Sequence, residues 1–326
     1  MKILLTGAAG FIGFHVAQKL LARGDEVVGL DNLNDYYDPN LKRARLAIIE
    51  RQPKFRFVKM DLADKGGMKA LFAREKFPRI IHLAAQAGVR YSLENPQAYI
   101  DSNVTGTLNV LEGCRHNSVE HLVFASTSSV YGLNTNMPFS VHRGVDHPLS
   151  LYASTKRANE LMAHNYAALF KLPVTGLRFF TVYGPWGRPD MAPILFSRAI
   201  LAGRPIEVFN EGRMRRDFTY IDEIVAGVLA ALDRVPVGPD SEPPHRVYNL
   251  GNHRPVELER FIGAIEQAAG RKAERILKPM QPGDMIETMA DTGRAERDLG
   301  FSPSTTIEQG VPALVDWCRS YYGSQA

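Results

Sequence analysis

The segment Lys2-Ile3-Leu4-Leu5-Thr6-Gly7-Ala8-Ala9-Gly10-Phe11-Ile12-Gly13 joins a short apolar run to three glycines that lie three residues apart. The apolar run predicts a buried strand, and the glycines predict a tight turn that opens a helix. Apolar residues at positions 12, 16 and 20 continue this helix along one stripe until about Gly24. A second apolar strand, residues 26–30, follows and ends at Asp31.

This order of strand, glycine turn, helix, strand and acid is typical of a dinucleotide site. The glycines let the backbone approach a pyrophosphate, and the free N–H groups at the helix start would bind its oxygens. A carboxylate at Asp31 would accept hydrogen bonds from an adenosine ribose and repel a 2′-phosphate, so NAD is favoured over NADP. No Lys-Ser/Thr pair follows the loop, which argues against a P-loop. The residues expected to bind the cofactor here are Gly7, Gly10, Phe11, Ile12, Gly13, Asp31 and Asn32.

Strands and helices continue to alternate after Asp31. Strands are predicted at residues 55–60, 79–83, 120–125 and 173–179, and helices at residues 41–51, 68–76, 96–117 and 151–170. The pattern predicts an α/β fold, a Rossmann-type doubly wound parallel sheet with ligands at the carboxyl ends of its strands. Further cofactor contacts are expected at two of these strand ends, from Asp61, Leu62, Leu83, Ala84 and Ala85. We interpret Lys42, Arg43 and Arg45 as a solvated helix face.

The pattern becomes irregular after about residue 180. A turn-rich loop at residues 183–191 precedes predicted helices at 192–202, 257–269 and 307–322, predicted strands at 206–209 and 246–250, and a Pro-rich surface loop at 236–244. We expect residues 1–180 to form the NAD-binding Rossmann domain. Residues 181–326 would form mainly a smaller C-terminal substrate-binding lobe, interleaved with the first domain.

The composition is ordinary for a soluble globular protein, with 45% hydrophobic and 23% charged residues. A formal net charge of +4, spread along the chain, argues weakly for an anionic small ligand and against nucleic acid. Cys114 and Cys318 lie far apart and outside any metal-ligand spacing, so we expect packing thiols and no metal site. The N-terminal apolar run is too short for a signal peptide, and no stretch is long enough to span a bilayer. We therefore expect a cytoplasmic protein without a membrane partner.

A second stretch of sequence indicates chemistry. The hydroxyl run at residues 126–129 follows a predicted strand, and Tyr152 and Lys156 lie four residues apart on one face of a predicted helix. A free phenol titrates near pH ~10, and a nearby ammonium favours the phenolate. Tyr152 could then act as a base, with a hydroxyl at Thr127 or Ser128 sharing the proton. Exposed helix faces often carry such pairs, so the pair alone does not separate a catalytic role from a structural one.

Together these motifs resemble the extended short-chain dehydrogenase/reductases, within them the nucleotide-sugar epimerases and dehydratases. The resemblance covers nearly the whole chain and extends to Arg178-Phe179-Phe180, Tyr183-Gly184-Pro185, Arg216-Asp217-Phe218 and Pro282-Gly283-Asp284. It implies an NAD-dependent isomerase with Tyr152, Lys156 and Thr127 as catalytic residues, the first two also contacting the cofactor. It also implies a homodimer formed through the helices at residues 96–117 and 151–170, although their apolar residues could equally cover the sheet.

Differences at the site narrow the expected activity. The 4,6-dehydratases carry an Asp-Glu pair where this chain has Ser128 and Ser129, and UDP-xylose-forming decarboxylases usually carry Glu at the second position. Uncharged hydroxyl donors suit a sugar carboxylate instead. The loop at residues 184–191 and the segment 87–92 resemble those of UDP-glucuronate 4-epimerases. The expected reaction converts UDP-glucuronate to UDP-galacturonate through a 4-keto intermediate. Substrate contacts are expected from Arg90, Thr127, Ser128, Ser129, Thr181, Arg188, Phe209, Arg216 and Asp284.

Two alternatives stay open. A 4-epimerase of this kind could act on the neutral sugars UDP-glucose and UDP-galactose. A non-catalytic NAD-binding sensor is the other alternative, but such proteins commonly lose the Tyr/Lys pair that is intact here.

Overall fold

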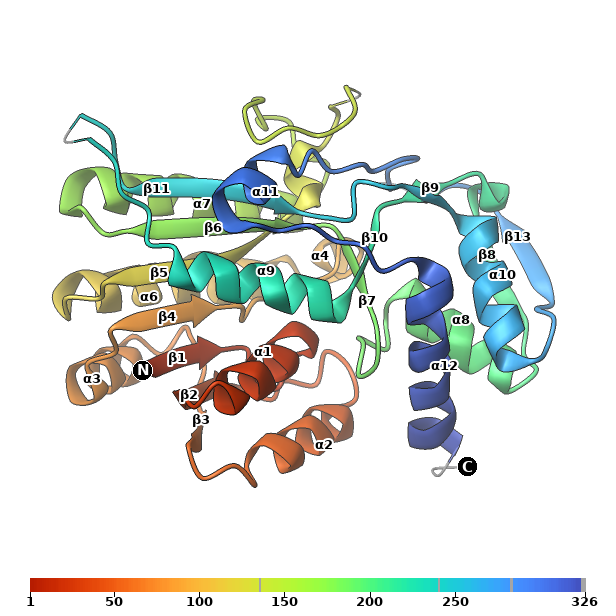
Figure 1. The fold of residues 1–326 in the computed structure, drawn as a ribbon, viewed down its shortest axis with the longest axis horizontal. Coiled ribbons are helices and arrows are strands. Elements are labelled where there is room, and N and C mark those ends of the chain that lie inside the picture. Colours follow the sequence, from red (N-terminus) through yellow and green to blue (C-terminus); the bar gives the residue numbers. More distant parts are fainter. Residues whose placement is uncertain (135, 240, 282–283, 324–326) are drawn as a thin grey trace.

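The computed structural model describes residues 1–134, 136–239, 241–281 and 284–323. Its centre is a seven-stranded sheet in the order β11-β6-β5-β4-β1-β2-β3, with every neighbouring pair parallel (Figure 1). The predicted doubly wound α/β fold is confirmed. The strands are β1 (Lys2–Thr6), β2 (Glu26–Asp31), β3 (Phe55–Lys59), β4 (Arg79–His82), β5 (His121–Thr127), β6 (Val174–Phe179) and β11 (His245–Leu250).

Helices cover both faces of the sheet. One face packs against α1 (Phe11–Ala22), α2 (Pro39–Ile49), α9 (Ile221–Asp233) and α11 (Gly293–Leu299). The other face packs against α3 (Lys65–Glu75), α6 (Gly106–His116) and α7 (Leu151–Phe170). Both layers are visible in Figure 1, with α1 and α9 in front of the strands. The helix α9, which buries seven of its residues, was not predicted from the sequence.

The segment predicted as one helix at residues 96–117 contains a wide turn. It consists of α5 (Pro96–Tyr99), a π-helical turn (Ile100–Thr105) and α6. In the π turn, Asn103 bonds the backbone of Gln86 through its side chain and donates to Thr155 Oγ1 at 3.0 Å. Its carbonyl oxygen accepts from Asn159 at 2.7 Å. Such turns are frequent at functional sites, and this one fixes α7 relative to the loop that follows β4.

The C-terminal lobe lies beyond the carboxyl ends of the sheet strands (Figure 1). Its core joins α8 (Ala192–Leu201), β8 (Ile206–Phe209), α10 (Leu258–Ala269) and α12 (Ile307–Gly323). The remaining elements are β7 (Thr181–Tyr183), β9 (Arg215–Arg216), β10 (Phe218–Tyr220), β12 (Val256–Glu257), β13 (Arg275–Lys278), α4 (Tyr91–Glu94) and the 3₁₀ turns Ser128–Tyr131 and Asn210–Gly212. Although β11 and α9 follow residue 180, they belong to the sheet and its covering layer.

The interpretation of Lys42, Arg43 and Arg45 as a solvated helix face is wrong for two of the three residues. Arg45 is fully buried, and Lys42 is 5% exposed. The reason is that α2 packs beneath the loop after β7, so that backbone carbonyls replace water around the guanidinium. Lys42 Nζ likewise donates to the backbone and side-chain oxygens of Asn34, at 2.7 and 2.6 Å. Of the three, Arg43 alone is exposed.

Candidate active site

Two adjoining cavities lie at the carboxyl ends of the strands. The first, about 370 Å³, is bordered by the glycine loop and the ends of β2, β3, β4 and β5. The second, about 1120 Å³, extends to α8 and β8 in the C-terminal lobe. Residues shared by both walls mark their junction, among them Tyr36, Gly88, Ser128, Ser129, Thr181 and Arg188. The structure places every predicted cofactor residue on the wall of the first cavity and every predicted substrate residue on the wall of one or both.

The glycine loop has no room for side chains at two of its positions. Gly7 has φ +74°, and a Cβ there would lie 2.8 Å from the backbone nitrogen of Ala84. A Cβ on Gly13 would lie 2.0 Å from the carbonyl oxygen of Gly7. The loop therefore passes directly over the end of β4, with its backbone open to a ligand in the cavity.

Asp31, predicted to contact an adenosine ribose, lies at the end of β2 on the wall of the first cavity. Its carboxylate is 8% exposed and accepts from the backbone nitrogens of Ala9 at 3.3 Å and Leu33 at 2.9 Å. Burial raises the pKa of this carboxyl, and the two backbone bonds act in the opposite direction. A buried carboxylate beside a glycine loop fits the ribose end of a dinucleotide.

Tyr152 lies in the first turn of α7, where Ser150 caps the helix by accepting from the backbone nitrogen of Ala153 at 3.1 Å. Burial raises the pKa of the phenol, while the charge of Arg188 and a hydrogen bond with Thr127 lower it. Arg188, on the loop after β7, is therefore one cation that favours the phenolate form of Tyr152. Arg188 was predicted as a substrate residue only.

Lys156 is 2% exposed, and burial lowers the pKa of its ammonium to about 8. The negative charge of Glu160, one turn further along α7, acts in the opposite direction. At neutral pH the ammonium is retained, next to a carboxylate that the sequence analysis did not single out. The spacing of four residues between Lys156 and Glu160 was the signal available for it.

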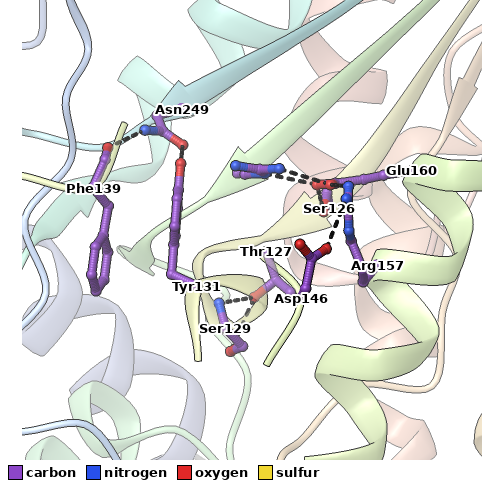
Figure 2. Close-up of polar contacts among 10 residues, drawn as sticks. Ser126, Thr127, Ser129, Tyr131, Phe139, Asp146, Arg157, Glu160 and Asn249 are labelled. Carbon is purple, nitrogen blue, oxygen red and sulfur yellow. Dashed lines mark hydrogen bonds and ion pairs between the residues drawn. The ribbon is translucent and has the colours of Figure 1, made fainter. Parts of the chain in front are cut away.

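Glu160 is the centre of a buried polar network (Figure 2). It accepts from Ser126 Oγ at 2.7 Å, from Arg178 Nε and Nη2 at 2.8 Å each, and from Arg157 at 3.2 Å. Both Glu160 and Arg178 are less than 4% exposed. Since Ser126 belongs to β5, Glu160 to α7 and Arg178 to β6, the network fixes α7 against two strands of the sheet.

At the end of β5 the hydroxyl run forms a turn that is closed by hydrogen bonds between Thr127 and Ser129. Thr127 Oγ1 accepts from the backbone nitrogen of Ser129 at 3.2 Å and donates to Ser129 Oγ at the same distance. Ser128, Ser129 and Thr181 border both cavities. The junction is therefore lined by neutral donors, with Arg188 as the adjoining positive charge.

Four predicted substrate residues meet in the second cavity. The guanidinium of Arg90 lies 5.0 Å from the ring centre of Phe209. Asp284 is 3.7 Å from Arg90 Nη2 and 3.9 Å from Arg216 Nη2. The neighbouring Pro282 and Gly283, which the resemblance included, lie outside the described residues. An aromatic ring beside two guanidinium groups suits a nucleotide base and its phosphates.

Among the described residues, no cluster of three or more His, Cys, Asp or Glu side chains could hold a metal ion. Cys114 and Cys318 are buried free thiols. No helix within the described ranges has the length and apolar character needed to cross a membrane.

The chain is similar to known proteins along nearly its whole length. Residues 3–251 match the NAD dependent epimerase/dehydratase family. A probable UDP-glucuronate 4-epimerase from Rhizobium meliloti (strain 1021) is 48% identical over 335 residues, covering 99% of this chain and 98% of that protein. UDP-glucuronate 4-epimerase 4 from Arabidopsis thaliana is 48% identical over 333 residues, covering 99% of this chain and 76% of that protein.

A solved structure gives the same result. The crystal structure of UDP-glucuronic acid 4-epimerase from Bacillus cereus, in complex with UDP-glucuronic acid and NAD, has a TM-score of 0.88 and 34% identity. The match covers 99% of this chain and 100% of the Bacillus cereus chain. The chain belongs to the NAD dependent epimerase/dehydratase family, which confirms the resemblance found in the sequence.

Proposed function

We propose that the protein catalyses the NAD-dependent 4-epimerisation of UDP-glucuronate to UDP-galacturonate. The observation that carries this proposal is the junction of the two cavities, where three hydroxyl side chains and the cation Arg188 border both walls, with Tyr152 on the wall of the first cavity. Neutral donors and one positive charge suit a sugar carboxylate. The names of the relatives from Rhizobium meliloti and Arabidopsis thaliana support the same substrate.

In this proposal the glycine loop and Asp31 hold the dinucleotide, with Asn32, Asp61, Leu62 and residues 83–85 along its path. Bound NAD⁺ would supply the acceptor, and on return the donor, of a hydride at C4 of the sugar. Tyr152, as phenolate, takes the proton of the sugar 4-hydroxyl, and Thr127 donates a hydrogen bond to the same oxygen. The charge of Arg188 favours the phenolate, and the buried ammonium of Lys156 adds positive charge one helical turn away.

The 4-keto sugar formed in this way is a β-keto acid, which can lose its carboxylate as CO₂. Ser128, Ser129 and Thr181 would restrain that carboxylate by hydrogen bonds while the 4-keto sugar rotates to present its other face to the hydride. The second cavity would hold the nucleotide, with Phe209 packing against uracil and Arg216 pairing with the diphosphate. Arg90 and Asp284 complete this end of the cavity.

We also propose that the protein is a homodimer. Among the described residues, the π turn and α6 expose Ile100 and Leu108, and α7 exposes Leu161, Leu169 and Phe170. Apolar side chains in water on two neighbouring helices are typical of an interface between copies. Sedimentation equilibrium that gives a single species near 36.3 kDa would contradict this assembly.

The direct test is to incubate the purified protein with UDP-glucuronate, with and without added NAD⁺, and to follow the sugars by proton NMR. UDP-galacturonate without UDP-xylose is the expected product. Conversion of UDP-glucose to UDP-galactose, with no conversion of UDP-glucuronate, would contradict UDP-glucuronate as the substrate and favour a neutral-sugar epimerase. No conversion and no NADH absorbance with any UDP-sugar would favour a non-catalytic NAD-binding protein.

A further inference from the structure

Arg188 is held by a carboxylate that the sequence analysis did not single out. Asp190 accepts from Arg188 Nε at 3.1 Å and from Arg188 Nη2 at 2.5 Å. A guanidinium has five N–H groups in one plane. This side-on pairing uses Nε–H and one hydrogen of Nη2, which leaves the two hydrogens of Nη1 and the second hydrogen of Nη2 for other acceptors. The pairing therefore also fixes the direction in which those hydrogens point.

Asp190 is itself held by Tyr36. The Tyr36 hydroxyl donates to Asp190 Oδ2 at 3.0 Å, and the Arg188 guanidinium lies 6.0 Å from the Tyr36 ring centre. Burial and the Asp190 charge raise the pKa of Tyr36 to about 12, so the hydroxyl remains a donor throughout the physiological range. We call these three connected side chains, Arg188, Asp190 and Tyr36, the Arg188 clamp.

The surroundings leave the clamp little room to move. The Tyr36 ring packs against Tyr91 with 4.8 Å between ring centres, and a Cβ on Gly88 would lie 2.3 Å from the Tyr36 hydroxyl. The backbone just before Arg188 is fixed separately, because His15 bonds the carbonyl oxygen of Pro185 at 3.0 Å and Arg45 bonds that of Gly187 at 3.2 Å. Position and orientation of the guanidinium are thus set before any ligand binds.

The clamp lies where it can select the sugar. Arg188 and Tyr36 border both cavities, whereas Asp190 borders the second alone. The side chains of Arg188 and Asp190 are 22% and 29% exposed, so the guanidinium is partly accessible from the cavity while it is paired with the carboxylate. A bidentate ion pair transmits geometry as well as charge.

We propose that Asp190, supported by Tyr36, is a positioning residue that orients the Arg188 guanidinium toward the sugar carboxylate and so sets the preference for uronate over neutral UDP-hexoses. The proposal rests on the proposed function, since it assigns the device by which that site distinguishes its substrate. Asp190 acts through Arg188 and makes no contact with the sugar in this scheme.

Two substitutions at residue 190 separate position from charge. Asp190→Glu keeps the charge and moves the carboxylate by one methylene, whereas Asp190→Asn keeps the length and removes the charge. Each variant is compared with the wild type for kcat/KM with UDP-glucuronate and for the inhibition constant of UDP-glucose, which has no carboxylate. Both variants are expected to lose about tenfold in kcat/KM for UDP-glucuronate, the range of one hydrogen bond to a charged group, with UDP-glucose inhibition within about twofold.

Tyr36→Phe removes only the hydroxyl that holds Asp190, and is expected to lower kcat/KM for UDP-glucuronate about threefold. Asp146→Glu and Asp146→Asn are the matched controls, because Asp146 is 70% exposed and pairs with Arg157 away from both cavities. Thermal unfolding of each variant checks that it is folded.

If Asp190→Glu has the same kcat/KM for UDP-glucuronate as the wild type, the positioning role is wrong and only the charge of residue 190 matters. Equal weakening of UDP-glucuronate and UDP-glucose would overturn it as well, because a merely structural residue would not distinguish the two sugars. A wild-type protein that does not turn over UDP-glucuronate would contradict the proposed function instead. The binding constants of the two sugars would then still decide whether the clamp selects the carboxylate.

Discussion

The guanidinium of Arg45 donates a 2.9 Å hydrogen bond to the carbonyl oxygen of Ala9, inside the glycine loop. The same side chain donates to the carbonyl oxygen of Trp186 at 2.6 Å and to the Tyr37 hydroxyl at 2.8 Å. It is fully buried, yet its acceptors are neutral. One cation in α2 therefore joins the loop expected to bind NAD to the loop that carries Arg188.

Arg45→Met should destabilise the protein by about 3 kcal/mol or more, because several buried oxygens lose their donor at about 1–3 kcal/mol each. Less NAD should remain bound after gel filtration, since the glycine loop loses its anchor. Urea unfolding and the NAD content of the purified protein measure the two effects. Arg43→Met, two residues away and exposed, is the control and should stay within about 0.5 kcal/mol of the wild type. Equal stability of the two variants would contradict the anchoring role.

Tyr152→Phe should lower kcat at least about 100-fold if the phenol is the base. Stability should change little, because the ring and its packing against Tyr99, with 6.1 Å between ring centres, are kept. Tyr166→Phe is the control on the same helix, since that hydroxyl bonds Glu112 at 2.6 Å. Near-normal turnover of Tyr152→Phe, measured by NMR with UDP-glucuronate, would remove the residue from the mechanism.

Glu160→Gln should lower the free energy of unfolding by about 3–5 kcal/mol, the usual cost of leaving one member of a buried ion pair without its partner. The affected cation is Arg178, which is 3% exposed. Asp146→Asn, which breaks an exposed pair with Arg157, should cost less than about 1 kcal/mol. Urea titrations of the three proteins test the difference, and similar midpoints for both variants would show that Arg178 finds another acceptor.

Stability should fall as the pH is lowered below about 6.5. Burial lowers the pKa of His82 to about 3 and that of His121 to about 4, from an unperturbed 6.5. Between these values and 6.5 the unfolded chain binds more protons than the folded protein, so the stability present above pH 6.5 is lost on acidification. Each histidine contributes about 1.4 kcal/mol per pH unit within that window.

Urea unfolding at pH 7 and pH 5 measures this loss. His121→Asn should show a smaller difference between the two pH values than the wild type, whatever its stability at pH 7. An equal difference in variant and wild type would show that other groups cause the acid sensitivity.

Most of the sheet could be predicted from the sequence, because local signals define it. The strand Lys2–Thr6 and the helix Leu151–Phe170 have the predicted bounds. Apolar runs and glycine turns are properties of a few neighbouring residues, so no knowledge of distant contacts was needed. The end of each strand could also be read locally, which is why the predicted residues all border the cavities.

What could not be predicted depends on contacts between distant residues. Arg45 is surrounded by protein and not by water partly because it bonds Trp186, which lies 141 positions later in the chain. The sequence of the helix itself does not indicate this contact. Tyr36 and Asp190 are 154 positions apart, and no local pattern near either residue indicates that their side chains meet. The helix α9 was missed because it follows the irregular segment after residue 180, where we expected only the substrate lobe.

The position of β11 has a consequence for synthesis of the chain. β6 is buried along its whole length and lies between β5 and β11, but β11 begins only at His245. A nascent chain that has reached residue 180 would therefore carry an open sheet edge with unpaired backbone groups, the kind of surface that pairs with other chains. Residues 1–180 lack the strand β11 that pairs with β6 in the complete sheet, so a product truncated near residue 180 should form aggregates and not a smaller NAD-binding protein.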